Sequence, residues 1–284
     1  MPNIDTPLND SRERLMTFPL PKPDSTCLVT GASSGIGEEI ARELARRGYN
    51  LTITARRFDR LSSLATELQS AFGVRVETAQ CDLRVDGERE ALLDRLENDG
   101  ITIDVLVNNA GLGGAGKLLS VPEERALDMI DTNIRALVWL TRRVADGMVR
   151  RREGAIMNVA STAAFQPIPT EAVYSASKAF VLHFGEAFSI ELAGSGVTCT
   201  TLCPGPTETE FADIAGISDG FDSLPGFVVA DPTFVAVEGV DAMARGKRLC
   251  IPGKLNKVTA VAGSKSPRTV VLRTLDTFWP GPRE

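Results

Sequence analysis

Tyr174 and Lys178 form the pair of residues whose types and spacing could do chemistry. Both lie in a segment, Ala172 to Leu192, that the sequence pattern predicts to be a helix. Residues four apart on a helix share one face, so the phenol and the ammonium point into the same space. A free phenol ionises at about pH 10, and a nearby cation lowers that pKa, which suits proton transfer. The alternative is an ordinary solvated helix face, so the pair must be judged by its surroundings.

Strand-like and helix-like segments alternate along the chain and would position this pair. Strands are predicted at Thr26–Thr30, Asn50–Ala55, Val74–Ala79, Ile103–Asn108, Ala155–Ser161, Val197–Pro204 and Arg248–Ile251. Helices are predicted at about Ile36–Arg47, Phe58–Phe72, Asp86–Asn98, Glu123–Arg151 and Ala172–Leu192. This alternation predicts the α/β class, with a parallel sheet covered by helices on both faces and joined by right-handed crossovers.

Length and composition favour one large domain with extensions. The chain has 284 residues, of which 43% are hydrophobic, and can bury one large core. Its net charge of -6 argues against a nucleic-acid partner, which needs a concentrated basic patch. No apolar run approaches the roughly 20 residues of a membrane-spanning helix. Met1–Pro23 lacks the pattern of a signal or transit peptide, so we expect a flexible arm, with packing on a partner subunit as the alternative.

The five cysteines predict neither disulfides nor a metal site. No Cys-x-x-Cys occurs, and most of the cysteines lie in or beside apolar strand-like runs. They are Cys27, Cys81, Cys199, Cys203 and Cys250. We expect small buried thiols, no bound metal and a reducing compartment, the cytoplasm.

The first predicted strand runs into a glycine-rich turn that could hold a dinucleotide. Gly31, Gly35 and Gly37 follow the strand and open the first helix. Glycines there permit a tight turn and let the backbone approach a pyrophosphate, whose charge is favoured at a helix N-terminus. The spacing is Gly-x-x-x-Gly-x-Gly, and a simple helix entry is the alternative.

Arg56 and Arg57 stand at the end of the second predicted strand, where a dinucleotide enzyme selects its coenzyme. A carboxylate there would hold the ribose 2′-hydroxyl of NAD, whereas guanidinium groups fit the 2′-phosphate of NADP. We therefore expect NADP(H). NAD(H) is the alternative if the arginines only begin a surface helix.

Together these residues resemble the short-chain dehydrogenase/reductase family from about Ser25 to Thr209, and more loosely to Pro252. The motifs that match in order and spacing are Thr30-Gly31-x-x-x-Gly35-Ile36-Gly37, Cys81-Asp82-Leu83, Asn108-Asn109-Ala110-Gly111, Asn133, Ser161, Tyr174-x-x-x-Lys178 and Pro204-Gly205. The resemblance implies a Rossmann-type doubly wound parallel sheet of about seven strands in three α/β/α layers. This catalytic domain would span residues 24–253, after the arm at 1–23 and before a helical extension at 254–284.

The resemblance also implies a catalytic set. Tyr174 would be the acid and base of hydride transfer between a carbonyl and a secondary alcohol, while Ser161 fixes the substrate oxygen. Lys178 would lower the pKa of Tyr174 and hydrogen-bond the nicotinamide ribose. Asn133 would hold, through its backbone carbonyl, a water that links Lys178 to bulk solvent.

The coenzyme contacts follow from the same resemblance. Asp82 would accept a hydrogen bond from the adenine amino group, and the Thr207 backbone would lie near the nicotinamide carboxamide. The full set is Gly31, Ser33, Ser34, Gly35, Ile36, Gly37, Arg56, Arg57, Asp82, Leu83, Asn109, Ala110, Gly111, Tyr174, Lys178, Pro204, Gly205, Thr207 and Thr209.

Residues 207–230 have the length of a lid with several apolar positions. Between Ala179 and Ala244 there are ten acidic residues and no lysine or arginine. A lid without a cation is badly suited to an anionic substrate, so we expect a small, neutral, lipophilic ketone or secondary alcohol. Phe211 in the lid and Phe165 opposite it are candidate contacts, in addition to Ser161 and Tyr174. A cation from elsewhere in the chain is the alternative.

The C-terminal part is basic, with nine Lys or Arg against two acids from Arg245 to Glu284. We expect it to dock on the body or on a neighbouring subunit, and an anionic membrane surface is the alternative. The resemblance implies a homodimer or homotetramer built on the long helices. His183, the only histidine, falls on the opposite side of its helix from Tyr174, so we expect no chemistry from it.

Three classes of function stay open. An NADP-dependent oxidoreductase is favoured because Ser161, Tyr174 and Lys178 are all present. A non-catalytic NADP-binding sensor or scaffold could use the same fold. An epimerase or dehydratase of the family's extended branch is disfavoured by the glycine spacing and the short C-terminal part.

Overall fold

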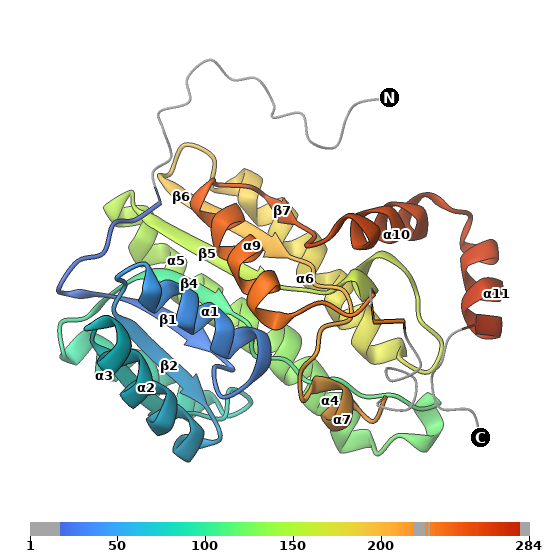
Figure 1. The fold of residues 1–284 in the computed structure, drawn as a ribbon, viewed down its shortest axis with the longest axis horizontal. Coiled ribbons are helices and arrows are strands. Elements are labelled where there is room, and N and C mark those ends of the chain that lie inside the picture. Colours follow the sequence, from blue (N-terminus) through green and yellow to red (C-terminus); the bar gives the residue numbers. More distant parts are fainter. Residues whose placement is uncertain (1–17, 218–224, 227, 279–284) are drawn as a thin grey trace.

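A seven-stranded parallel sheet, in the order β3-β2-β1-β4-β5-β6-β7, forms the centre of the fold (Figure 1). The computed structural model describes residues 18–217, 225–226 and 228–278. The strands are β1 (Ser25–Thr30), β2 (Leu51–Ala55), β3 (Val76–Gln80), β4 (Thr102–Asn108), β5 (Gly154–Val159), β6 (Val197–Leu202) and β7 (Leu249–Cys250). The strand order reverses between β1 and β4, and open α/β sheets bind ligands at the carboxyl ends of the strands beside such a point.

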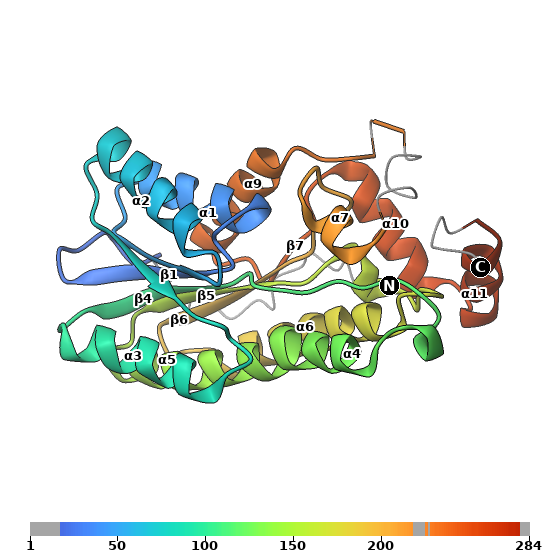
Figure 2. The same cartoon turned by 90° about the horizontal axis from the view of Figure 1, so that it is seen from below.

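Helices cover both faces of the sheet and give three layers (Figure 2). One face carries α1 (Gly35–Arg46), α2 (Phe58–Phe72) and α9 (Pro232–Ala244). The other carries α3 (Asp86–Asn98), α4 (Glu123–Ile130), α5 (Leu137–Arg151) and α6 (Ala172–Glu191). The predicted Rossmann-type fold is confirmed, and the predicted strands differ from the observed ones by a residue or two at their ends.

The strands read as continuous apolar runs because both of their faces are buried. Every residue of β1 is buried, and successive side chains point to opposite faces of the sheet. Leu28 packs in a cluster with Leu140 of α5, whereas its neighbour Val29 packs with Ile40 of α1. This two-sided packing fixes the end of β1, from which the glycine turn starts.

The predicted helix at 123–151 is interrupted. It consists of α4, a π-helical turn η2 (Asp131–Ala136) and α5. Such π-helical turns occur often at functional sites, and Asn133 lies in this one. The structure also has two short 3-10 helices, η1 (Leu118–Ser120) and η3 (Thr162–Phe165), and the short helix α7 (Phe211–Ala215).

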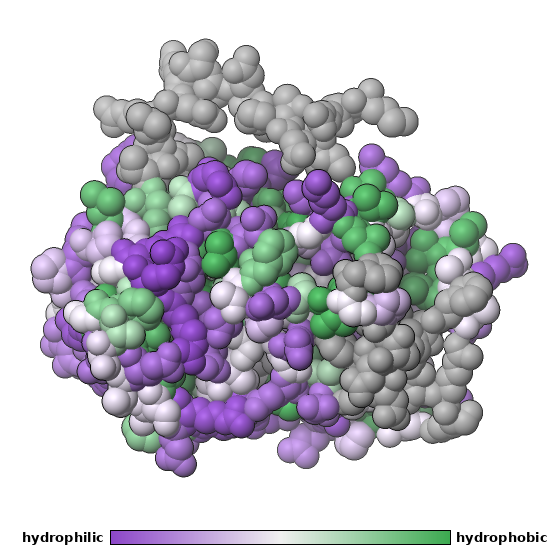
Figure 3. All heavy atoms as spheres, in the orientation of Figure 1, coloured by the Kyte–Doolittle hydropathy of each residue, from purple (hydrophilic) through white to green (hydrophobic). Residues whose placement is uncertain are grey.

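The C-terminal extension forms α10 (Lys254–Lys265) and α11 (Arg268–Phe278), and it docks on the body of its own chain. Gly263 of α10 packs so close to η3 that a Cβ there would lie 2.7 Å from Oε1 of Gln166. Arg268 donates a hydrogen bond to the carbonyl of Phe165. Apolar side chains also gather on the outer surface of α10 (Figure 3), among them Val258, which is 65% exposed.

The end of the predicted N-terminal arm is packed, which corrects its description as flexible up to Pro23. The ring of Phe18 meets that of Tyr49 edge-on at 5.4 Å, and the Tyr49 hydroxyl donates to the carbonyl of Pro19 at 2.7 Å. Lys22 forms an ion pair with Glu153. Residues 1–17 lie outside the described part of the chain.

Two further expectations concern the cysteines and membrane-spanning helices. All five cysteines are buried free thiols, as expected. Within the described part of the chain, no helix is both long enough and apolar enough to span a bilayer.

Candidate active site

A cavity of about 730 Å³ opens at the carboxyl ends of the strands beside the switch point. Its walls come from the glycine turn after β1, the ends of β2 and β3, the loops after β4, β5 and β6, and the helices α6, α7 and α10. This is the place where the strand order predicts a ligand.

The glycine turn is shaped so that the protein backbone can come close to a ligand. Gly31 and Gly35 have φ of 66° and 61°, a backbone conformation that residues other than glycine rarely adopt. A Cβ on Gly37 would lie 2.2 Å from Nδ2 of Asn109. Ser33, Ser34 and Ile36 line the cavity along with the glycines, so the N-terminus of α1 opens into it. This geometry fits the diphosphate cradle that the sequence predicts.

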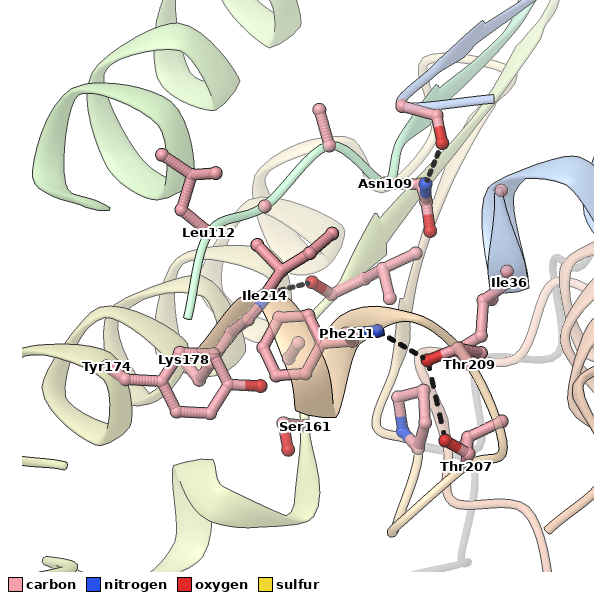
Figure 4. A pocket seen from close by; sticks show the side chains of 18 of the residues that line it. Ile36, Asn109, Leu112, Ser161, Tyr174, Lys178, Thr207, Thr209, Phe211 and Ile214 are labelled. Carbon is pink, nitrogen blue, oxygen red and sulfur yellow. Dashed lines mark hydrogen bonds between the residues drawn. The ribbon is translucent and has the colours of Figure 1, made fainter. Parts of the chain in front are cut away.

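Asn109 holds this turn in place. Its Nδ2 donates to the carbonyl of Thr30 at 2.9 Å. It also donates to the carbonyl of Gly31 at 3.2 Å (Figure 4). The Thr30 hydroxyl in turn accepts from the backbone N–H groups of Asn109 and Ala110, each at 3.0 Å. These contacts lock the end of β4 to the end of β1, and they leave Ala110 and Gly111 facing the cavity.

Two arginines stand beside the glycine turn, where the sequence places the coenzyme selector. Arg57 donates from Nε to the Ser33 hydroxyl at 3.2 Å and from Nη2 to the Ser34 hydroxyl at 2.6 Å. Arg56 also lines the cavity and is exposed. Guanidinium groups next to hydroxyls and helix N-terminal amides form a donor set that fits a phosphate monoester.

Asp82 is already engaged in an ion pair that the sequence pattern did not reveal. Its carboxylate accepts from Nε of Arg84 at 3.0 Å and from Nη2 at 2.6 Å. This hydrogen bonding with Arg84 lowers the pKa of Asp82 from its ordinary value. Arg84 and Leu83 line the cavity beside Asp82, so Arg84 joins the candidate binding residues.

Tyr174, Ser161 and Lys178 come together at the other end of the cavity (Figure 4). Tyr174 is 8% exposed and Lys178 is 5% exposed. Lys178 Nζ lies 5.8 Å from the centre of the tyrosine ring and donates to the carbonyl of Val159 at 3.0 Å. The Ser161 hydroxyl accepts from the N–H of Ala163 at 3.1 Å, at the start of η3. The end of β5 and the first turns of α6 thus bring the predicted catalytic groups into one place.

Burial sets the protonation of this pair. Burial raises the pKa of Tyr174 above its ordinary value, hydrogen bonding with Ser161 opposes the rise, and the charge of Glu171 adds to it. Burial lowers the pKa of Lys178 to about 8. In this structure Nζ bonds the Val159 carbonyl and desolvation dominates the pKa of Tyr174, so the expected lowering of that pKa by Lys178 stays a prediction. The phenol is protonated at neutral pH.

Asn133 is buried and joins the loop after β4 to α6. Its Oδ1 accepts from the N–H of Leu112 at 2.8 Å, and its Nδ2 donates to the Ser177 hydroxyl at 2.9 Å. Gly111 lies close to both Asn133 and Lys178, because a Cβ on Gly111 would lie 3.2 Å from Lys178 Nζ and 3.4 Å from Asn133 Oδ1. The side chain thus positions the floor of the site, while the water-holding role of its backbone carbonyl stays a prediction.

The segment after β6 closes the cavity against the glycine turn. The Thr207 hydroxyl donates to the carbonyl of Gly205 at 2.9 Å, and the N–H of Phe211 donates to the Thr209 hydroxyl at 3.3 Å (Figure 4). A Cβ on Gly35 would lie 3.0 Å from Cγ2 of Thr209. These residues and Pro204 line the cavity, as expected.

Phe211 forms one wall of the cavity at the end that holds Tyr174, the expected substrate end, and Phe165 does not. The Phe211 ring lies 5.5 Å from the Tyr174 ring (Figure 4). Phe165 is not among the described residues that line the cavity. It packs instead in the cluster around Val181 and Ile251, under α10. The lid positions Phe221, Leu224 and Phe227 lie outside the described residues.

The sequence pattern also missed several residues of the substrate end. Glu171, which directly precedes α6 and lies three residues before Tyr174, is 5% exposed and lines the cavity. The spacing of three residues from Tyr174 could have revealed it. Helix α10 contributes three more lining residues, for which the sequence held no such indication. They are Leu255, Asn256 and Thr259.

The charges along the cavity are unevenly distributed. Among the described lining residues the cations are Arg56, Arg57, Arg84 and Lys178. The three arginines lie at the glycine-turn end, so the substrate end has Lys178 as its cation and Glu171 as its anion. The histidine expected to take no part, His183, is exposed on α6 and does not line the cavity.

Comparison with known proteins shows the family of this chain. The family model described as short chain dehydrogenase matches residues 25–216. A putative ketoacyl reductase of Streptomyces coelicolor is 42% identical over 187 residues, which cover 65% of this chain and 71% of that protein. An NADP-dependent 3-hydroxy acid dehydrogenase of Salmonella typhi is 41% identical over 189 residues, covering 66% of this chain and 75% of that protein.

Solved structures show the same relationship. A short-chain dehydrogenase from Sphingobium yanoikuyae in complex with NADPH superposes with a TM-score of 0.75 at 33% identity, over 88% of this chain and 95% of that one. A short-chain dehydrogenase/reductase from Burkholderia phymatum in complex with NAD superposes with a TM-score of 0.76 at 25% identity, over 84% and 92%. The chain belongs to the short-chain dehydrogenase family and is an NAD(P)-dependent dehydrogenase or reductase.

Proposed function

We propose that the protein is an NADP(H)-dependent oxidoreductase that interconverts a carbonyl and a secondary alcohol, with Tyr174 as the acid and base. One observation carries the proposal. Buried Tyr174 and Lys178 and half-buried Ser161 line the same cavity as the glycine turn and Arg57. A nucleotide site and a proton-transfer site therefore share one space, which a non-catalytic sensor or scaffold would not need.

The catalytic groups divide the work of a reduction. Bound NADPH supplies the hydride. Tyr174, protonated because burial raises its pKa, gives its proton to the carbonyl oxygen. The Ser161 hydroxyl donates a hydrogen bond to the same oxygen and orients it. The Lys178 ammonium stabilises the phenolate that remains. In oxidation each of these steps runs backwards.

NADP(H) is the proposed coenzyme, and NAD(H) is the second candidate. Arg56 and Arg57 flank the cavity at the end of β2, where an NAD enzyme would carry a carboxylate for the ribose. The NADPH complex and the NADP-dependent relative support this choice. The NAD complex of another neighbour keeps the second candidate open.

We propose a small, neutral and lipophilic substrate. The wall around Tyr174 includes Ile168, Phe211 and Ile214, and apolar side chains bury a ligand of the same character. Glu171 places a carboxylate in this wall, and a carboxylate repels an anionic substrate. The pocket therefore favours a ketone without a negative charge near its carbonyl.

We propose the cytoplasm as the location and a homodimer or homotetramer as the assembly. Five buried free thiols suit a reducing compartment. Large apolar side chains stay exposed on the long helices, for example Leu127 on α4 and Phe180 and Ile190 on α6. An interface with another subunit would bury these side chains.

The test is the loss of NADPH absorbance when carbonyl compounds are added to the full chain. We expect turnover of neutral ketones, with a 3-keto acid of matched length reduced at least about tenfold less efficiently. A protein that binds NADPH but turns over no carbonyl compound would support the sensor alternative. Preference for the keto acid would contradict the proposed substrate class without contradicting the reaction.

A further inference from the structure

Glu210 holds two arginines at the coenzyme end of the cavity. Its Oε2 accepts from Nη1 of Arg57 at 2.8 Å, and its Oε1 accepts from Nη1 of Arg60 at 2.6 Å. Arg57 also donates to the hydroxyls of Ser33 and Ser34. One cluster of charges therefore links the first turn of α2, the glycine turn and the residue that precedes α7.

The carboxylate of Glu210 occupies the groups that a 2′-phosphate needs. Arg57 is one of the two guanidinium groups proposed to select NADP, and its Nη1 is taken by Glu210. Hydrogen bonds with Arg57 and Arg60 lower the pKa of Glu210, so its negative charge persists at neutral pH. A phosphate monoester presents the same kind of acceptor with more charge, and two anions cannot share the arginines without repulsion.

From this geometry we infer that Glu210 competes with the 2′-phosphate of NADP(H) for Arg57 and Arg60, and so determines coenzyme selectivity. The inference rests on the proposed preference for NADP(H). When the phosphate binds, both arginines turn from the carboxylate to the phosphate, and Arg60 becomes a phosphate ligand in addition to Arg57. NAD(H), which has a 2′-hydroxyl there, leaves the Glu210 ion pairs intact.

The exposure of the cluster makes this exchange feasible. The side chains of Arg57 and Glu210 are each 40% exposed, and that of Arg60 is 50% exposed. Exposed ion pairs are individually weak and are screened by salt, so a dianion can displace the carboxylate. A buried pair would resist such displacement.

The exchange also joins the two ends of the cavity. Glu210 directly precedes Phe211, whose ring packs on Tyr174. Helix α7 carries Ile214 as well, another residue of the substrate wall. When the phosphate displaces Glu210, the start of α7 therefore loses its ion pairs with Arg57 and Arg60, and α7 carries the ring that contacts Tyr174.

The test compares coenzyme affinities of the full-length chain and three variants by coenzyme fluorescence at low ionic strength. E210Q removes the competing charge and keeps the shape of the side chain. E208Q is the matched control, because Glu208 is exposed in the same segment. R60Q removes the second phosphate ligand. Each protein is titrated with NADPH and with NADH, which differ only in the 2′-phosphate.

We expect E210Q to bind NADPH about three- to tenfold more tightly, with NADH affinity unchanged. E208Q should change both affinities by less than about twofold, and R60Q should weaken NADPH but not NADH. High salt should reduce the difference in NADPH affinity between E210Q and the wild type. Weaker NADPH binding by E210Q, or equal shifts for both coenzymes, would overturn the inference while leaving the coenzyme preference intact. A wild type that binds NADH as tightly as NADPH would remove the preference itself, and the inference with it.

Discussion

Tyr174 illustrates how far the type and spacing of residues predict chemistry. The spacing of Tyr174 and Lys178 on α6 correctly placed both groups in one buried cavity. It did not predict their protonation, because the pKa of each group depends on desolvation by parts of the chain far away in sequence. Burial moves both groups toward their neutral forms, and Lys178 bonds the Val159 carbonyl rather than the phenol.

Replacement of Tyr174 by phenylalanine tests the acid and base directly. Y174F removes only the hydroxyl, so kcat for a ketone should fall by at least about 100-fold, while NADPH affinity changes little. Steady-state kinetics and a coenzyme titration measure the two effects. The chain has two tyrosines, so Y49F is a matched control. It loses the hydrogen bond to Pro19, which should cost about 1 kcal/mol of stability and leave kcat unchanged. A Y174F enzyme that kept most of its rate would exclude the assignment.

The pH dependence of reduction should follow Lys178. Its pKa is lowered to about 8, so the ammonium is present below that pH and is lost above it. The phenol keeps its proton over this range, because its pKa is raised. We therefore expect kcat/KM for a ketone to be level near neutral pH and to fall as the pH rises through about 8, since the phenolate product loses its cation. A profile that stays level up to pH 10 would contradict this, provided that NADPH still binds.

Glu171 should tune both the proton donor and the choice of substrate. Its charge raises the pKa of Tyr174, so E171Q should lower that pKa and move the rising limb of alcohol oxidation to lower pH. The same change should raise kcat/KM for a keto acid by about two- to tenfold, because the like charge in the wall is gone. E191Q, at the exposed end of α6, is the control. If E171Q raised kcat/KM for the keto acid but left the pH profile of oxidation unchanged, the predicted effect of the Glu171 charge on the pKa of Tyr174 would be wrong.

At the scale of elements, the sequence predicted the helices with clear polar and apolar faces and missed α9. Its residues Val235, Ala236, Val240 and Met243 are buried, and it packs against α1. A helix covered on several sides loses the apolar stripe that identifies helices in a sequence. Its start was nevertheless marked, because Asp231 caps the N–H of Thr233 at 2.7 Å and a proline follows it.

The glycine turn was predicted from the spacing of glycines after the first strand, and the structure gives the physical reason for one of them. A Cβ on Gly37 would lie 2.2 Å from Nδ2 of Asn109 and 2.5 Å from the carbonyl of Gly31. G37A should therefore force the turn apart, raise the Kd for NADPH by about tenfold or more and cost roughly 1–3 kcal/mol of stability. G87A is the control, because a Cβ on Gly87 of α3 meets nothing within 4 Å. Similar melting and affinity in both variants would contradict the packing argument.

At the scale of the whole molecule, the parallel sheet brings together residues that are distant in sequence. The strand order places the ends of β1, β4, β5 and β6 side by side, so the motifs after each of them meet in one cavity. Alternation of strands and helices was enough to predict this gathering. The part played by the C-terminal extension was not predictable, because its contacts with Gly205 and Gln166 depend on the shape of the finished body.

Helix α10 closes the substrate end, so its removal should harm turnover more than coenzyme binding. A Cβ on Gly205 would lie 2.3 Å from Oδ1 of Asn256, which shows how closely α10 covers the loop after β6. A chain that ends at Gly253 loses Asn256 and Thr259 from the cavity. It also loses Ala260 and so uncovers the apolar cluster that contains Val181 and Ile251. We expect kcat/KM for ketones to fall by roughly tenfold or more, because the loop beside the substrate loses its support.

The control for this truncation is a chain that ends at Ser266, which keeps α10 and removes α11. It should retain more of the activity, because the lining residues Leu255, Asn256 and Thr259 stay in place. In both truncated chains NADPH should bind within about threefold of the full-length affinity, since the glycine turn and Arg57 lie at the other end of the cavity. Coenzyme binding therefore also shows that the shortened proteins are folded. Full activity in the chain that ends at Gly253 would mean that α10 only covers the body and takes no part in forming the substrate site.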